Sequence, residues 1–118
     1  MSMMKSIMVA AVAAVVLAAP VWAQTKPLTD WRGMTLYTFD QDTATTSNCN
    51  GTCTATWPPM FAAADATGAG NWSLLTRGDG NKQWTYKGKP LYTYKNDAKP
   101  GDTNGNGQGN NTWHSALP

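Results

Sequence analysis

Two cysteines close together in the sequence offer the first candidate chemistry. Cys49 and Cys53 are the only cysteines of the chain, and Asn50 and Gly51 between them favour a tight turn. The N-terminal leader described below indicates an exported chain, and exported chains meet oxidising conditions. The spacing therefore favours a structural disulfide between Cys49 and Cys53.

The same two thiols admit two functional alternatives. Together with the single histidine, His114, they could hold Cu(I) or Zn(II), because these ions prefer thiolate and imidazole ligands. A redox-active exchange site is the other alternative, although the sequence has no Cys-x-x-Cys and no βαβ pattern of the thioredoxin type. The candidate copper or zinc ligands are thus Cys49, Cys53 and His114.

A second candidate site lies in the Gly/Asn-rich run near the C-terminus. Asp102, Asn104 and Asn106 place oxygen-bearing side chains at alternate positions before Gly107, as in the first half of a calcium-binding loop. The twelfth position of such a loop requires a bidentate glutamate and is here Trp113. The run predicts either a calcium site or a plain loop.

The aromatic residues could also form a site. Trp57, Trp84 and Trp113, with the tyrosines, supply large rigid surfaces that could stack on sugars or another planar ligand. A small domain also needs such side chains for its core, so both interpretations stay open. No motif indicates a catalytic residue, and the sequence predicts a non-enzymatic protein without a required cofactor.

These residues are organised by a repeated stretch. Residues 33–42 and 88–97 share the pattern Gly-x-x-Leu-Tyr-Thr-aromatic-x-x-Asp, and a tryptophan follows each copy at nearly equal spacing. The simplest explanation is a duplicated supersecondary unit, with pseudo-repeats around 31–57 and 84–113. The aspartates that close the copies, Asp42 and Asp97, are expected to accept backbone N–H bonds in the turns that follow.

The first 23 residues are typical of a cleaved signal peptide. Lys5 precedes an apolar run over 7–19, and Val21-Trp22-Ala23 provides small residues where cleavage after Ala23 is expected. The remaining 24–118 would form a single domain without a membrane span. With eight basic and seven acidic residues, its net charge of +1 gives no reason to expect a nucleic-acid partner.

Composition and alternation predict an all-β fold. Turn-forming Asp, Gly, Asn, Thr and Pro separate the aromatic positions, and the chain has no glutamate. A three-stranded meander is expected over 72–77, 83–86 and 91–95, with an Asp-Gly turn at Asp79-Gly80 and a closing strand near Trp113. Its aromatic residues are expected on one face. The predicted architecture is a small antiparallel barrel or sandwich built from two pseudo-repeats and stapled by one disulfide.

Several ordered motifs resemble one bacterial family. They are the paired segments Tyr37/Phe39/Asp42 and Tyr92/Tyr94/Asp97, together with Cys49-x-Gly51-x-Cys53, Trp57-Pro58-Pro59, the run from Asp79 to Tyr92, Pro100-Gly101-Asp102 and Trp113-His114. They resemble the predicted secreted or lipoprotein-like proteins with the Yx(FWY)xxD motif, also called the secreted repeat of unknown function. The resemblance implies an exported bacterial protein and no particular activity. Many members are predicted lipoproteins, whereas this chain lacks a lipidation cysteine after its leader.

The sequence therefore predicts a non-catalytic binding or envelope-associated domain, exported to the periplasm or the extracellular space. Its ligand or envelope partner is not identified by any motif. The alternative is a periplasmic metal-handling protein that uses copper or zinc.

Overall fold

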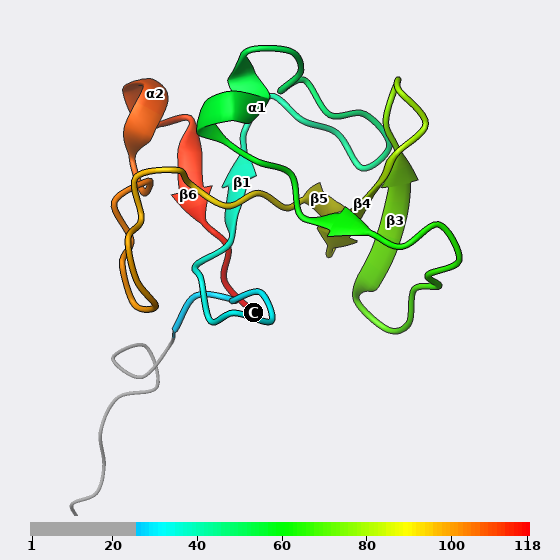
Figure 1. Ribbon diagram of the computed structural model, residues 1–118, viewed down its shortest axis with the longest axis horizontal. Helices are drawn as coiled ribbons and strands as arrows, with labels where there is room; N and C mark the ends of the chain where they lie inside the picture. Colours follow the sequence, from blue (N-terminus) through cyan, green and yellow to red (C-terminus); the bar gives the residue numbers. More distant parts are fainter. Residues whose placement is uncertain (1–25) are drawn as a thin grey trace, which may run out of the picture.

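The computed structural model describes residues 26–118, so the predicted signal peptide, residues 1–23, lies outside the described residues. The division into a leader and a domain over 24–118 stays a prediction. Figure 1 shows short strands joined by long loops, with the C-terminus beside the first described segment. In chain order the elements are β1 (Tyr37–Phe39), α1 (Cys53–Thr56), β2 (Phe61–Ala62), β3 (Trp72–Thr76), β4 (Lys82–Tyr86), β5 (Lys89–Pro90), α2 (Gln108–Asn111) and β6 (Trp113–Ser115).

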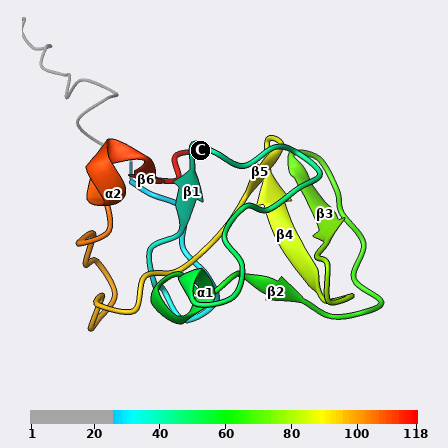
Figure 2. The same cartoon turned by 90° about the horizontal axis from the view of Figure 1, so that it is seen from above.

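The fold is all-β with antiparallel pairing, as predicted. β1 pairs with β6, while β4 lies between β3 on one side and β2 and β5 on the other. Figure 2 shows the two sheets as separate groups of strands joined by loops, with β1 and β6 on the left and β2 to β5 on the right. In the described part of the chain they do not close into a barrel, so the sandwich-like alternative fits. None of the helices in residues 26–118 has the length and apolar character needed to cross a bilayer.

The β3–β4 hairpin follows from local turn chemistry. Gly80 adopts a φ of +90°, a left-handed conformation that glycine reaches without steric cost, and the Arg77 N–H bonds the Asn81 carbonyl at 2.8 Å. The resulting register places Leu75 opposite Gln83 and Trp72 opposite Tyr86. Because strand side chains alternate, one face carries buried polar groups and the other carries half-buried aromatic rings.

The two copies of the repeated stretch meet at their tyrosines. Tyr37 and Tyr92 lie opposite one another in an antiparallel bridge, with N–H to carbonyl distances of 2.7 and 3.0 Å. Two half-units cross at this bridge, the first over 28–60 and the second over 84–116.

The backbone bonds on either side of the bridge correspond in pairs. The Ala116 N–H bonds the Leu36 carbonyl at 2.8 Å, and the Met60 N–H bonds the Leu91 carbonyl at 2.8 Å. The Asp40 N–H bonds the Thr112 carbonyl, and the Lys95 N–H bonds the Thr56 carbonyl. In each case a residue of one half-unit bonds a residue of the other. The duplicated unit predicted from sequence is thus an intertwined pair related by an approximate twofold axis.

The buried side chains form two clusters. The first contains Tyr37, Cys49, Trp57, Tyr92 and Trp113, and the second is built on Leu36, Leu91 and Ala116.

The predicted meander is wrong in its third strand. Only Lys89–Pro90 pairs with β4, and residues 92–95 instead bond the segment 56–59 through backbone groups. Tyr92 and Tyr94 consequently belong to the first cluster, whereas Trp84 and Tyr86 pack against the second. The pairing ends because Met60 intervenes after Leu91. The Leu91 N–H still bonds the Trp84 carbonyl at 3.1 Å, but the Trp84 N–H and the Leu91 carbonyl both bond Met60.

Candidate functional site

The residues of the repeated motif form crossed tyrosine–aspartate pairs. Tyr37 Oη donates to Asp97 Oδ2 at 2.6 Å, and Tyr92 Oη donates to Asp42 Oδ2 at 2.6 Å. Each tyrosine of one half-unit thus bonds the aspartate that closes the motif of the other. Both tyrosine side chains are fully buried. The motif forms an internal clasp between the halves.

Each aspartate of the clasp also holds the loop that follows it. The Asn48 N–H donates to Asp42 Oδ1 at 2.7 Å, and the Asn104 N–H donates to Asp97 Oδ1 at 2.9 Å. The side-chain amide of each asparagine reaches back to the carbonyl of the residue before its aspartate. Sequence reasoning missed Asn48 as a partner and considered Asn104 only as a calcium ligand. Their common position nine residues before Trp57 and Trp113 could have revealed them.

Burial governs the ionisation of these groups. Burial, and then the bond to Asp42, raises the pKa of Tyr92 to about 12. Burial, reinforced by the bond to Asp97, raises the pKa of Tyr37 still further. Burial also raises the pKa of Asp42, against the lowering effect of its bonds to Tyr92 and Asn48. At neutral pH both phenols therefore keep their protons and act as hydrogen-bond donors.

Stacked indole rings fill the space between the pairs. The rings of Trp57 and Trp113 lie 3.8 Å apart between centroids with 1° between planes, and both side chains are buried. Tyr94 stacks on Trp57 at 4.4 Å, and Phe39 stacks on Trp113 at 4.3 Å. These predicted aromatic residues are core, because each ring is covered by rings of the opposite half-unit.

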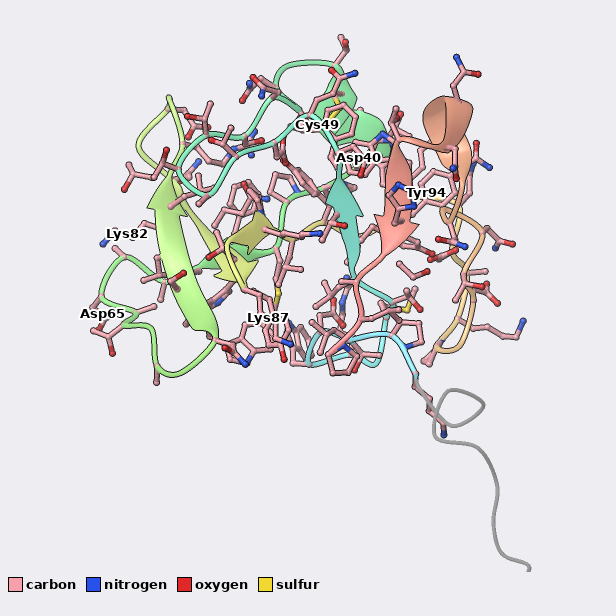
Figure 3. All side chains as sticks on the ribbon, turned by 180° about the vertical axis from the view of Figure 1, so that it is seen from behind. Asp40, Cys49, Asp65, Lys82, Lys87 and Tyr94 are labelled. Carbon is pink, nitrogen blue, oxygen red and sulfur yellow. A yellow bond between two sulfur atoms is a disulfide. The ribbon has the colours of Figure 1, made fainter. Side chains whose placement is uncertain are left out.

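The predicted disulfide is confirmed, with an S–S distance of 2.02 Å between Cys49 and Cys53. Figure 3 shows Cys49 beside α1, near the end of β1 where Asp40 also lies. Arg77 of the β3–β4 hairpin also holds the loop that contains the disulfide. Its Nη2 donates to the Cys49 carbonyl at 2.7 Å and to Asn50 Oδ1 at 2.9 Å.

The proposed copper or zinc ligands have other partners in this structure. Cys49 and Cys53 are joined to each other, and His114 Nε2 lies 2.9 Å from Asp40 Oδ2. Within residues 26–118 no group of three or more His, Cys, Asp or Glu side chains could hold a metal ion. The copper or zinc hypothesis stays a prediction, and it would require reduction of the disulfide because thiolates are the ligands.

The proposed calcium ligands point to different partners. Asp102 accepts the Ala98 N–H at 2.8 Å, and this bond, with those from Lys99, holds the pKa of its carboxyl below the usual range. Asn106 Oδ1 accepts the Ser115 N–H at 3.0 Å, and the Asn104 amide donates to the Asn96 carbonyl. The loop is held by its own hydrogen bonds, and calcium binding stays a prediction.

Exposed aromatic residues lie outside the clasp. A hollow of about 350 Å³ is lined by Asp30, Trp31, Arg32, Pro58, Pro59, Met60, Phe61, Trp84 and Thr93. A second hollow, of about 380 Å³, is lined by Met60, Thr67, Ala69, Trp72 and Trp84. Met60 and Trp84 line both hollows, so the two are contiguous. We name this surface the aromatic platform, and it consists of Trp31, Met60, Phe61, Trp72 and Trp84.

The fold and the clasp define a class, namely small disulfide-containing β domains built from a duplicated, intertwined unit. The chain belongs to the family described as a secreted repeat of unknown function, whose model matches residues 25–60 and 73–116. Each matched segment contains one half-unit, and the family description places the chain among exported proteins. No curated protein and no solved structure matches the chain.

Proposed function

We propose that this chain is a non-catalytic binding domain, exported to the periplasm or beyond, that holds a polysaccharide of the bacterial envelope on its aromatic platform. The observation that carries this proposal is the exposure of the platform's rings. Trp31 is 89% exposed and Phe61 is 54% exposed, although a domain of this size needs most large apolar side chains for its core.

The chemistry of the platform suits sugar rings. Indole and phenyl faces are rigid and apolar, and they can stack on the apolar face of a pyranose at little entropic cost. Beside Trp31, the Arg32 guanidinium and the Asp30 carboxylate pair at 2.9 Å and present polar groups at the edge of the hollow. Contiguous shallow hollows fit several units of an extended polymer better than one small molecule.

The motif residues support a non-catalytic role. The buried phenols and carboxylates of the clasp bond each other and the backbone, which is the pattern of groups that hold a fold. Under this proposal the tyrosine–aspartate motif builds the scaffold, and ligand contact falls to the surface around β2 and β4.

Sedimentation with isolated peptidoglycan sacculi, together with affinity electrophoresis in gels containing soluble polysaccharides, tests the proposal. The double variant Trp31→Ala, Phe61→Ala should bind at least about tenfold more weakly, while its stability should stay within about 0.5 kcal/mol because both rings are exposed. Leu117→Ala removes an equally exposed apolar side chain outside the platform and should bind like wild type. Wild-type affinity in the double variant, or no retention by any polysaccharide, would refute the proposal.

A further inference from the structure

Arg77 is a buried cation without a carboxylate partner. Arg77 lies at the start of the hairpin turn and is only 7% exposed. Within the described residues, no acidic group lies within ion-pair distance of its guanidinium. The guanidinium instead donates to neutral oxygens, those of Ser47, Gln83, Asn50 and the Cys49 carbonyl. These four bonds involve the two Nη nitrogens, and no carboxylate contacts the guanidinium to compensate its positive charge.

The second half-unit forms its loop without a comparable charge. In the second half-unit the corresponding loop, residues 97–112, keeps the aspartate–asparagine bond and ends in a short helix before its tryptophan. The described residues bring no guanidinium to that loop: the Arg32 side chain donates to Asp30, and the Arg77 side chain donates to the first loop and Gln83. A buried charge that only one of the two half-units carries is therefore a candidate for a role beyond the scaffold.

A hollow of about 380 Å³ lies against this guanidinium, between the loop after β1 and the end of β3. Figure 1 shows that loop reaching across to the tip of the β3–β4 hairpin. Its lining combines hydroxyl groups, one amide and the arginine, with no acidic residue: Thr45, Thr46, Ser47, Asn50, Thr76, Arg77 and Gly78. We name it the hydroxyl hollow.

We infer that the hydroxyl hollow binds an oxyanion, such as a carboxylate, sulfate or phosphate group. The threonine hydroxyls can rotate toward anionic oxygens, and the buried guanidinium supplies a positive field that water screens weakly. Thr45 and Thr46 are exposed at the rim, where their hydroxyls can reach a ligand.

The nearby carboxylates leave the hollow accessible to an anion. Asp79 does not line the hollow; it lines an adjoining groove of about 680 Å³, and its carboxylate accepts bonds from Asn81. Asp42 accepts the Tyr92 hydroxyl and the Asn48 N–H, and it does not line the hollow. The inference is independent of the aromatic platform, because the two surfaces share no lining residue.

NMR titration of the disulfide-bonded protein tests this site. At constant ionic strength, chloride is exchanged for sulfate or phosphate in one arm and for oligogalacturonate in another, while the Arg77 Nε–H and the backbone signals of 45–47 are followed. Saturable shifts of these signals are expected with at least one oxyanion. Saturation by the inorganic ions would indicate a free anion as ligand, whereas saturation by the oligosaccharide alone would indicate an acidic polymer.

Substitution at the rim separates binding from folding. The double variant Thr45→Val, Thr46→Val keeps the side-chain shape at two exposed positions and should bind about tenfold more weakly. Thr103→Val makes the same change at an exposed position that lines neither the hollow nor the aromatic platform, and it should bind like wild type. Shifts that grow linearly without saturating, that appear equally in chloride, or that persist unchanged in the double variant would overturn the inference.

Discussion

The two loops that follow the clasp aspartates do the same structural work with different residues. The disulfide loop, residues 42–56, and the glycine loop, residues 97–112, each begin at an aspartate that bonds a tyrosine of the opposite half-unit. Each then uses an asparagine N–H to satisfy that aspartate and leads through a short helix to a stacked tryptophan.

What differs is the pair of positions eight and four residues before the tryptophan. They hold Cys49 and Cys53 in the disulfide loop, and Gly105 and Gly109 in the glycine loop. The Gly105 N–H donates directly to Tyr37 Oη at 3.2 Å, whereas in the disulfide loop the Ser47 hydroxyl bonds Tyr92 Oη in the corresponding place. Glycine permits the closer approach of backbone to phenol.

The comparison indicates that the tyrosine–aspartate clasp and the stacked tryptophans specify both loops. The disulfide and Arg77 are features of the first loop alone. Removal of a shared feature should therefore lower the free energy of unfolding by a similar amount in either half-unit. The unshared parts should affect one loop only. The predictions below test both statements.

The largest expected effect is loss of a stacked indole. Trp57→Ala and Trp113→Ala should each lower the free energy of unfolding by about 3–5 kcal/mol, because each leaves a large cavity beneath rings of both half-units. Urea denaturation measures the loss, with exposed Trp31→Ala as the control. A loss confined to one of the two tryptophans would break the proposed equivalence of the halves.

Gly105→Ala should be the next most costly change. A Cβ there would lie 2.9 Å from ring atoms of Trp57 and from Cε1 of Tyr37, both buried, so the core would have to shift. We expect a loss of about 2–3 kcal/mol, the upper part of the range for overpacking. Gly78→Ala is the matched control, since its Cβ would meet no atom within 4 Å. Equal denaturation midpoints for the two variants would contradict the close approach of this loop to the core.

The sequence predicted the unit and missed how two units combine. The repeated Gly-x-x-Leu-Tyr-Thr pattern, the disulfide and the Asp-Gly hairpin are local signals, and the structure contains all three. The clasp joins Tyr37 to Asp97 and Tyr92 to Asp42, 60 and 50 residues apart, and strand periodicity carries no information about such long-range partners. The prediction of a third meander strand was wrong for the same reason, because Tyr92 pairs with Tyr37 and not with β4.

Sequence reasoning left an aromatic ligand surface open and named Trp84 among its residues, but it could not say which aromatic rings are exposed. Trp31 and Phe61 look like core residues in the sequence, and only the three-dimensional structure shows that they are exposed beside Trp84. Arg77 appears in a hairpin turn, and its burial depends on contact with a loop about 30 residues earlier. Side-chain alternation assigns residues to faces, and it cannot say which face another segment covers.

Reduction of the disulfide should weaken the protein without abolishing its fold. The glycine loop makes the same aspartate–asparagine bonds and leads to its tryptophan without a covalent link. Loss of the Cys49–Cys53 bond should therefore cost about 2 kcal/mol, the entropy of closing a five-residue loop. Near-ultraviolet circular dichroism with and without dithiothreitol should show retained tertiary structure, and urea midpoints should show the loss. Complete unfolding on reduction at 25 °C would show that the two loops are not equivalent.

The smallest expected effect concerns alkaline pH and the clasp phenols. The pKa of Tyr92 is about 12 in the folded protein against 10.0 for a free phenol, so the folded state holds this proton more tightly than the unfolded state. The stability due to this difference is fully present below pH 10 and is lost as the pH rises toward 12. Between about pH 9 and about pH 10.5, wild type should therefore lose about 0.8 kcal/mol more than Tyr92→Phe.

Tyr37→Phe provides the comparison between the two halves. Because burial raises the pKa of Tyr37 even further, its removal should flatten the pH dependence over the same interval at least as much as Tyr92→Phe does. Both variants lose a hydrogen bond at every pH, so the slope of the free energy of unfolding against pH is the informative quantity, measured by urea denaturation at several pH values. If both variants kept the wild-type slope, the phenols would be titrating alike in the folded and unfolded states, and the clasp would not be the dry, shared contact between the half-units that the geometry describes.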